Sequence, residues 1–508
     1  MVIMISTGRN GRRCGLLMVV LVLPAGVRSA DWTVTPSLVV REAYSDNIHL
    51  APSGQAQGEF TTEVSPGVAI TATGPRLTLA LDYSLHRVAY THEPDRNNQQ
   101  LAASIHAAAV PDWLFLDAQS TISQQNISAF GQQRIDNSQS TSNSETIHTT
   151  SFSPYLRHYF RGFATVELRH DYQHVGSGGL LEVHSNDSSA RVTSDNGGQG
   201  WTWQLYADHR VIDDAALAPV TMDDASLTLN FPLNSRFALF TTRGYESNDY
   251  HALGDNPKGR YWSAGASWTP SVRTSISASL GRRYFGRTHT LDASYRMRSM
   301  FWTLQYNEDI TTSQDQFLSL PPTAVSDFLN QLWLSRIPDP QVRQQTIKAF
   351  LGLSQLLGPT GNVNYFSHRY FLQKQWQLST VYSGIRSALS LTAASSGRTA
   401  QTASSVDSLL LAPDQLSLED RTRQNSLQAG WNWQLSPRDG LNLSASTNTV
   451  RSLSTSRKDR NDVLMLSLTR QLAPRISASA DLRHVRHTSN AGGDYRENGA
   501  SVTLSMQF

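Results

Sequence analysis

The last eleven residues of the chain, 498–508, constrain the fold more than any other stretch. Apolar side chains occupy every second position there, and polar side chains fill the positions between them. The apolar residues are Ala500, Val502, Leu504, Met506 and Phe508, and the polar ones are Ser501, Thr503, Ser505 and Gln507. Because successive side chains of a strand point to opposite faces, this stretch predicts a strand with one apolar and one polar face. Such a strand suits the edge of a soluble sheet, or a wall between lipid and water.

The same alternation returns along most of the chain after Trp32. Two clear examples are residues 77–85, where Leu and Tyr alternate with polar residues and alanine, and residues 464–469, where three leucines alternate with Met465, Ser467 and Thr469. A soluble sandwich would carry a denser core of Val, Ile and Phe on its apolar faces. Several polar faces also hold opposite charges close together, which a wet lumen accommodates. The pattern therefore predicts a large transmembrane antiparallel β-barrel, an all-β fold.

Charged residues on these polar faces form a candidate lumen charge network. Its members are Asp82, Glu167, Arg169, Asp171, Asp481 and Arg483. We expect them to pair with one another inside the barrel. A selectivity filter is the alternative interpretation of the same residues.

Two kinds of connection separate the predicted strands. Short ones contain Pro or Gly, as at 73–76, 110–112 and 473–475, and longer polar ones include 45–58, 125–146, 175–185 and 397–421. Short turns alternating with long loops are typical of a barrel with periplasmic turns and extracellular loops. The spacing predicts about 22 strands, and 18 or 20 stay open because residues 282–300 are ambiguous. The number is even if both termini lie in the periplasm.

The N-terminus carries the parts of a secretory signal. Arg9, Arg12 and Arg13 precede an apolar run at 16–23, and small residues follow as far as Ala30. That run is too short to span a bilayer as a helix, so residues 1–30 are interpreted as a cleaved signal peptide and 31–508 as the barrel. The single cysteine, Cys14, would leave with the signal. An exported chain without a membrane helix is soluble in the periplasm, secreted, or a barrel, and the strand pattern favours a barrel in the outer membrane of a Gram-negative cell.

The composition limits the classes of partner that we expect for this chain. Only 17% of residues are charged, and the net charge is +2, with basic residues dispersed along the chain. A nucleic-acid partner is therefore not expected, because such proteins cluster their basic residues. The expected partners are outer-membrane lipid and the barrel-assembly machinery.

One segment departs from the strand pattern. Between residues 312 and 362 the apolar period changes from two to 3.6, which predicts two amphipathic helices in an extracellular loop. Asp339 and Pro340 fit the start of the second helix, and Gly358 with Pro359 its end. We expect this loop to constrict the lumen through Phe328, Leu332, Trp333, Phe350 and Leu353. A surface cap and a contact with the outer leaflet are the alternatives.

Several stretches resemble known outer-membrane proteins. Val502, Leu504, Met506 and Phe508 resemble the closing strand of bacterial outer-membrane barrels, which implies an assembly signal. The stretches at 35–48, 50–54 and 63–68, with 336–340, resemble the outer-membrane proteins associated with PEP-CTERM (exosortase) systems. Those are uncharacterised predicted barrels commonly encoded near exopolysaccharide export and biofilm genes. The resemblance implies components of exopolysaccharide export as further partners.

Catalytic and metal-binding motifs are missing from the sequence. It contains no Gly-x-Ser-x-Gly, no His-Glu-x-x-His, no Walker-type phosphate loop and no paired cysteines. His170 and His174 would share a strand face about 13 Å apart, too far to hold one ion together. We therefore predict neither an enzyme nor a cofactor or metal site. A TonB-dependent transporter also has 22 strands, but we expect no room for its plug before Trp32.

The sequence thus predicts an outer-membrane β-barrel that acts as a channel or passage component, linked by the resemblance to exopolysaccharide export. The alternatives are a general diffusion porin, a structural or surface barrel that does not conduct, and a barrel hydrolase. A pore predicts conductance, whereas a scaffold predicts a filled lumen.

Overall fold

The computed structural model describes residues 30–139, 141–195, 200–254, 256–318, 366–408, 410 and 415–508. They form 22 strands, one short α-helix and one 3-10 helix at Ser404–Asp407. The strands are β1 Asp31–Ser45, β2 Glu59–Thr73, β3 Leu77–Tyr90, β4 Arg96–Val110, β5 Leu114–Asn126, β6 Ser144–Phe160, β7 Ala164–Ser177, β8 Leu181–Ser194, β9 Thr202–Asp214, β10 Val220–Asn234, β11 Phe237–Asn248, β12 Lys258–Ser271, β13 Thr274–Arg283, β14 Gly286–Arg296, β15 Met300–Thr311, β16 Phe371–Ser383, β17 Ser387–Ala400, β18 Arg421–Gln434, β19 Asp439–Ser452, β20 Lys458–Ala473, β21 Ile476–Ser489 and β22 Tyr495–Gln507. The helix α1 spans Ser313–Leu318.

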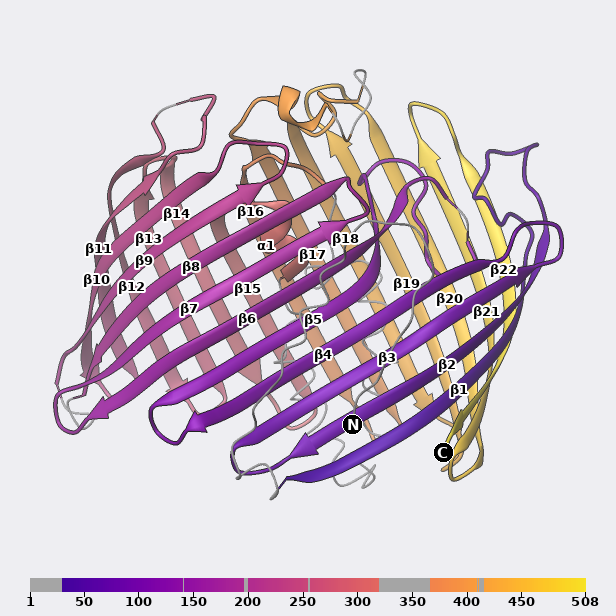
Figure 1. Cartoon of the computed structure of the whole chain (residues 1–508), viewed down its shortest axis with the longest axis horizontal. Coiled ribbons are helices and arrows are strands. Elements are labelled where there is room, and N and C mark those ends of the chain that lie inside the picture. The colour runs from indigo at the N-terminus through magenta and orange to yellow at the C-terminus, as the bar shows by residue number, and fades with distance from the viewer. Residues whose placement is uncertain are drawn as a thin grey trace, which may run out of the picture.

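The strands close into one ring. Each strand pairs antiparallel with its neighbours in sequence, and β1 pairs with β22 from Ser37 opposite Gln507 to Ser45 opposite Gly499. At the seam Phe508 N donates to Pro36 O at 2.9 Å. Figure 1 shows the strands leaning across the wall. A closed antiparallel ring satisfies every wall amide without water, so it can span a bilayer. The prediction of a 22-stranded barrel is confirmed.

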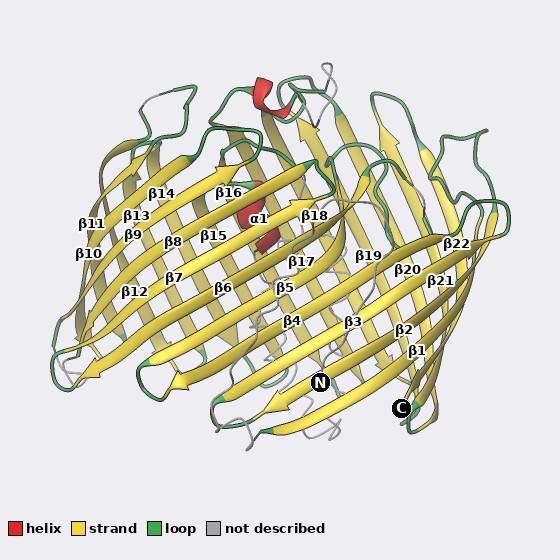
Figure 2. Ribbon diagram, viewed as in Figure 1, coloured by secondary structure: helices red, strands yellow, loops and turns green. Residues whose placement is uncertain are grey.

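The two ends of the barrel differ in their connections. At one end short turns join the strands, as at 74–76, 235–236 and 474–475, and the other end carries the long loops at 46–58, 127–143 and 401–420. Figure 2 shows these two ends, with the C-terminus at the short-turn end. In outer-membrane barrels the short turns are periplasmic, so the loop end faces outward. We call the loop end the outer mouth.

Two stretches that the sequence left ambiguous or assigned to a loop become strands. Residues 282–300 contain the end of β13, all of β14 and the start of β15. The turn 284–285 joins β13 to β14 at the outer mouth. The expected long loop at 175–185 is wrong, because β7 and β8 are joined by residues 178–180 alone. Gly178 and Gly179 have positive φ values of 42° and 101° there, a conformation glycine adopts without strain.

Side chains alternate across the wall as the sequence predicts. Leu464 and Leu468 of β20 are 47% and 46% exposed on the outer face, and Val502 and Phe508 are each 61% exposed near the seam. Their neighbours along each strand point into the lumen. The exterior is therefore an apolar band that lipid covers, and the interior is polar.

The predicted helical loop lies mostly outside the described residues. Of residues 312–362 only 312–318 are described, and they contain α1, which Figure 2 shows inside the ring near the outer mouth. The constriction candidates Phe328, Leu332, Trp333, Phe350 and Leu353 lie outside the described residues, as does the predicted signal peptide as far as residue 29. No described helix is long and apolar enough to cross a membrane.

Candidate functional site

The charges that alternation places on β7 meet inside the wall. Arg169 lies 3.6 Å from Glu167 and 3.7 Å from Asp171, and it also reaches Asp117 of β5 at 3.4 Å. Glu167 is held at 2.6 Å by Arg157 of β6. These residues form one ion-pair network across three strands, extended by two partners that the sequence analysis did not name.

The remaining three candidates have different surroundings. Asp481 and Arg483 share the inner face of β21, but no ion pair joins them among the described residues. Asp481 accepts hydrogen bonds from Ser479 and Ser501 at 3.2 and 3.3 Å. Asp82 also faces the lumen, in register with Ala69 and Ala102. Arg483 turns instead to the outer mouth.

One of the predicted long loops, at 125–146, crosses the mouth, a role that the sequence did not indicate. Residues 127–139 and 141–143, here called the inner loop, connect β5 to β6 and fold into the ring. Asp136 of this loop pairs with Arg483 of β21 and, at 3.0 Å, with Arg41 of β1. Because Arg483 also binds Glu497 of β22 at 2.6 Å, the loop is joined to both sides of the barrel seam.

Further contacts hold the inner loop on the seam side. Gly131 N donates to Asp459 of β20 at 2.8 Å, and Tyr90 of β3 donates to Ser138 O at 2.9 Å. Gln133 N donates to the hydroxyl of Tyr495 on β22 at 3.2 Å. The inner loop thus leaves the wall at β5 and β6 and reaches strands on the other side of the seam.

A second segment fills the mouth from β15. The helix α1 and residues 366–370 pack on the outer ends of β6 to β10, where apolar residues face inward. This apolar cluster contains Ile147, Val175, Leu181, Val183, Ile212, Val220, Tyr250, Phe366 and Tyr370. Arg210 of β9 binds Asp315 of α1 at 3.1 Å, and His368 binds Asp214 at 2.6 Å. The space left between this segment and the wall is about 20 Å³, room for about one water.

The two segments touch each other. Phe366 N donates to Ile127 O at 2.9 Å, and Phe130 of the inner loop packs with Phe371, Leu418 and Val450. The inner loop and the segment around α1 therefore cover the mouth together.

Three loop side chains in the mouth are electrostatically unusual. Burial alone would raise the pKa of Asp136, but the guanidinium groups of Arg483 and Arg41 hold it well below its usual range. Burial raises the pKa of Glu419 to about 8, and the carboxylate of Asp407 adds to the rise. Burial would lower the pKa of His368, but Asp214 raises it overall. The mouth thus combines a firmly charged contact with a carboxyl whose pKa is raised to about 8 and an imidazole whose pKa is raised.

The inner wall opposite the α1 segment is lined by amides and hydroxyls. The inward residues of β16 to β19 include Gln373, Gln375, Gln377, Ser379, Thr392, Ser396, Gln424, Ser426, Gln428, Asn442, Ser444, Ser446 and Asn448. Within these four fully described strands, alternation leaves Arg398 as the one charged side chain that faces inward. Groups that both donate and accept hydrogen bonds suit uncharged polar solutes.

Two further features lie on the outside of the wall. A groove of about 530 Å³ lies on the outer face of β6 to β9. Its lining includes Leu156, Leu168, His170 and His209. Above it, His174, Glu182 and His184 form a set that could hold a metal ion.

The pattern of apolar residues at inward strand positions could have indicated that part of the mouth is covered. At the outer ends of β7, β8 and β9, the inward positions Val175, Val183 and Ile212 are apolar where a wet lumen would favour polar residues. Such a break marks a wall patch that another segment covers. No such pattern identifies Asp136 as the partner of Arg483, because the two residues are 347 positions apart in the sequence.

Comparison with known proteins finds similar structures and no similar sequence. No family model and no curated protein matches the chain. The siderophore receptor PirA from Pseudomonas aeruginosa is 9% identical, with a TM-score of 0.47 over 94% of this chain and 80% of its own. The FrpB iron transporter from Neisseria meningitidis is 10% identical, with a TM-score of 0.47 over 93% and 81%. OccK1 from Pseudomonas aeruginosa is 9% identical, with a TM-score of 0.34 over 94% and 99%.

At these identities and scores the likeness carries no argument about function. The class of this protein follows from its own strand pairing and its apolar exterior. The chain is a β-barrel protein of the Gram-negative outer membrane.

Proposed function

We propose that the protein is a passage for small uncharged polar solutes, closed at the outer mouth by the inner loop and the α1 segment. The observation that carries this proposal is the inner face of β16 to β19, where amides and hydroxyls line the wall and Arg398 is the one charge. A wall of this kind can exchange hydrogen bonds with a passing hydroxylated solute without binding an ion firmly. This proposal corresponds to the diffusion porin considered as an alternative from the sequence.

Export of an exopolysaccharide is a second candidate. The resemblance to PEP-CTERM system proteins motivates it, and no comparison addresses it. The same wall supports it, because sugar hydroxyls both donate and accept hydrogen bonds. A chain-like substrate would, however, need the inner loop to move aside over its whole length.

The test measures solute flux with the full mature chain in liposomes. Swelling is recorded in a neutral monosaccharide, a charged sugar of equal size, a neutral oligosaccharide, and a monovalent salt, all of matched osmolarity. Single-channel current is recorded in planar bilayers. A passage for uncharged solutes gives monosaccharide flux that exceeds the flux of a charged sugar of equal size. A polysaccharide passage also admits the oligosaccharide once Asp136 is changed to Asn, which loosens the loop.

A structural barrel gives the contrary result. If neither the native chain nor Asp136→Asn admits any of these solutes, the proposal of a passage is wrong. Equal flux of neutral and charged sugars would keep the passage but reject its preference for uncharged solutes.

A further inference from the structure

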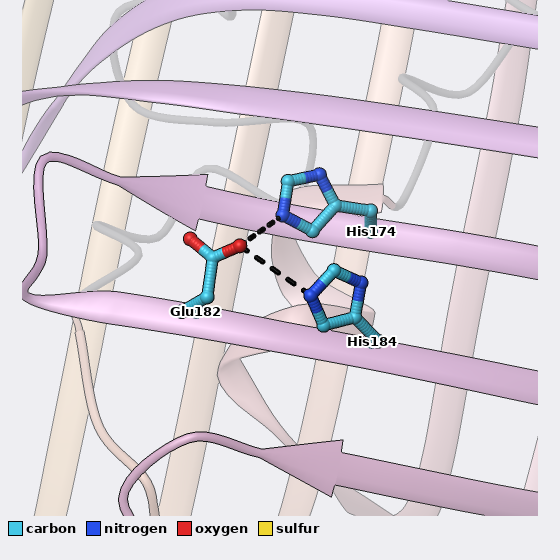
Figure 3. A group of neighbouring side chains, drawn as sticks. All are labelled: His174, Glu182 and His184. Atoms are coloured by element: carbon cyan, nitrogen blue, oxygen red, sulfur yellow. Dashed lines mark hydrogen bonds and ion pairs between the residues drawn. The ribbon is translucent and has the colours of Figure 1, made fainter. Parts of the chain in front are cut away.

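A compact donor set lies on the outside of the barrel, on the β7–β8 hairpin (Figure 3). His174 Nε2 lies 2.7 Å from one carboxylate oxygen of Glu182, and His184 Nε2 lies 3.4 Å from the same oxygen. The three potential ligand atoms all lie within 4.8 Å of one another. Their side chains are 26%, 45% and 40% exposed in the order of the chain, so an ion could reach them from solution.

The strand register brings the three residues together. His174 is the Cα partner of His184, and Gly176 is the partner of Glu182, across the three-residue turn at 178–180. Because residues two apart on a strand share a face, all three side chains point away from the lumen. They lie on the mouth side of the outward-facing Tyr172, and therefore next to the outer rim.

The space between the side chains depends on Gly176. A Cβ placed there would lie 2.9 Å from a carboxylate oxygen of Glu182 and 3.1 Å from His174 Nε2. The side chains of His174 and Glu182 thus come together beside Gly176, which has no side chain to keep them apart. The imidazole rings of His174 and His184 are stacked, with centroids 4.4 Å apart and planes at 15°.

The donors suit a transition-metal ion. Two imidazoles and one carboxylate are a recurring zinc ligand set, and they leave a fourth position open for water or another ligand. With bonds of about 2.0–2.1 Å, tetrahedral ligands lie about 3.4 Å apart. The observed contacts of 2.7 and 3.4 Å need only small rotations of the side chains to reach this spacing.

One neighbour fixes the orientation of a donor. The hydroxyl of Tyr172 lies 3.1 Å from His184 Nδ1. If Nδ1 carries the proton and donates it to this hydroxyl, Nε2 keeps its lone pair toward Glu182. Such partners hold metal-bound histidines in the tautomer that binds.

We propose that His174, Glu182 and His184 form a binding site for one divalent transition-metal ion, Zn²⁺ by the chemistry of its donors. The site lies on the outer wall and is independent of the passage. Since its ligands come from two strands, a bound ion links β7 to β8 at the rim and stabilises the folded hairpin. The open coordination position faces outward.

The experiment uses the full chain in detergent, with any affinity tag removed. Zn²⁺ binding is measured by isothermal titration, and Co²⁺ is added separately because its visible absorption reports nitrogen ligands and low coordination number. One equivalent of each metal is expected to bind, and Mg²⁺ is expected not to compete, because it prefers six oxygen ligands.

Matched variants assign the ligands. His184→Gln and Glu182→Gln are expected to abolish the Co²⁺ band and to weaken Zn²⁺ binding more than tenfold. The control His170→Gln removes another outward histidine of β7, which is bonded to Ser188 at 2.9 Å, and it is expected to bind as the native chain does. Tyr172→Phe should weaken binding about tenfold, the size of a typical outer partner effect.

Two outcomes would overturn the proposal. One is the absence of saturable Zn²⁺ binding by the native chain, and the other is equal loss in His170→Gln and His184→Gln. Migration on unheated denaturing gels shows whether each variant is a folded barrel. Glu182→Gln adds an independent test, because it keeps the shape of the side chain and removes its charge.

Discussion

At the scale of single residues, Asp136 decides how firmly the mouth is closed. Its carboxylate is shared by Arg41 and Arg483, and a hydrogen bond to a charged group contributes about 1.5–3 kcal/mol. Asp136→Asn keeps one acceptor oxygen but removes the charge. We expect the ratio of closed to open loop to fall about tenfold, seen as a longer time in a high-conductance state.

Asp95→Asn is the matched control for that change. Asp95 pairs with Arg87 at 3.0 Å, but both side chains are exposed, and exposed pairs contribute little. Its current should therefore match that of the native chain. Equal currents from the two variants would mean that Asp136 does not hold the loop.

Glu419 makes the stability of the barrel depend on pH. Ser128 Oγ of the inner loop donates to its carboxyl at 3.3 Å, and burial raises its pKa to about 8. An unfolded glutamate loses its proton near pH 4.3, so between that pH and about 8 the folded state holds more protons. The contribution of Glu419 to the free energy of unfolding therefore falls as pH rises over this interval, and this contribution changes no further above it.

The variant Glu419→Gln removes that dependence, because glutamine stays neutral. Asp407, Arg369 and Arg398 also face Glu419, and they stay in place in the variant. The measurement is the denaturant midpoint of the barrel in detergent at pH 5, 6.5, 8 and 9. His368, whose pKa is raised by Asp214, also loses its stabilising charge as pH rises, so a reduced slope is expected in Glu419→Gln. An unchanged slope would contradict the role given to Glu419.

At the scale of elements, the alternation along each strand could be predicted and the extent of the hairpins could not. The run 175–185 contains glycines, serine, histidine and glutamate, so it has the composition of a loop. It is nevertheless strand over most of its length, because its outward residues stand at the rim, where polar groups meet water. The predicted distance between His170 and His174 concerns one strand alone. That argument does not consider His184, which the neighbouring strand supplies.

The strand β20 tests which face meets lipid. Leu466 lies halfway along β20 and points outward, 37% exposed, and Ser467 points into the lumen. A lysine on the lipid face near the bilayer midplane costs about 2–4 kcal/mol, whereas a lumen position stays hydrated. We expect Leu466→Lys to lower the unfolding free energy in vesicles by that amount and Ser467→Lys to leave it nearly unchanged. If Ser467→Lys lowered the unfolding free energy more than Leu466→Lys, the assignment of the two faces would be wrong.

At the scale of the whole molecule, closure of the mouth depends on contacts between distant parts of the chain. Asp136 and Arg483 are separated by 347 residues, and Ser128 and Glu419 by 291. A local period of two places Arg169 and Arg483 inside the barrel, but it cannot say which loop folds back to meet them. The ring could therefore be predicted from the sequence, and the apolar inward positions at the outer ends of β7 to β9 mark a covered patch, but the loop that meets Arg483 could not be predicted.

The ring itself can be tested at its seam. Val39 of β1 and Ser505 of β22 are Cα partners on the inner face, and strand neighbours of this kind lie within reach of a disulfide. With Cys14 changed to serine, the pair Val39→Cys and Ser505→Cys should crosslink on mild oxidation and migrate as a covalent circle on denaturing gels. Val39→Cys with Thr503→Cys is two residues out of register, so it should stay largely reduced. In this register Val39 is paired with Ser505, and Thr503 is paired with Arg41, so Val39 lies closer to Ser505 than to Thr503. Equal crosslinking of both cysteine pairs, or of neither, would mean that β1 and β22 do not close the barrel in this register.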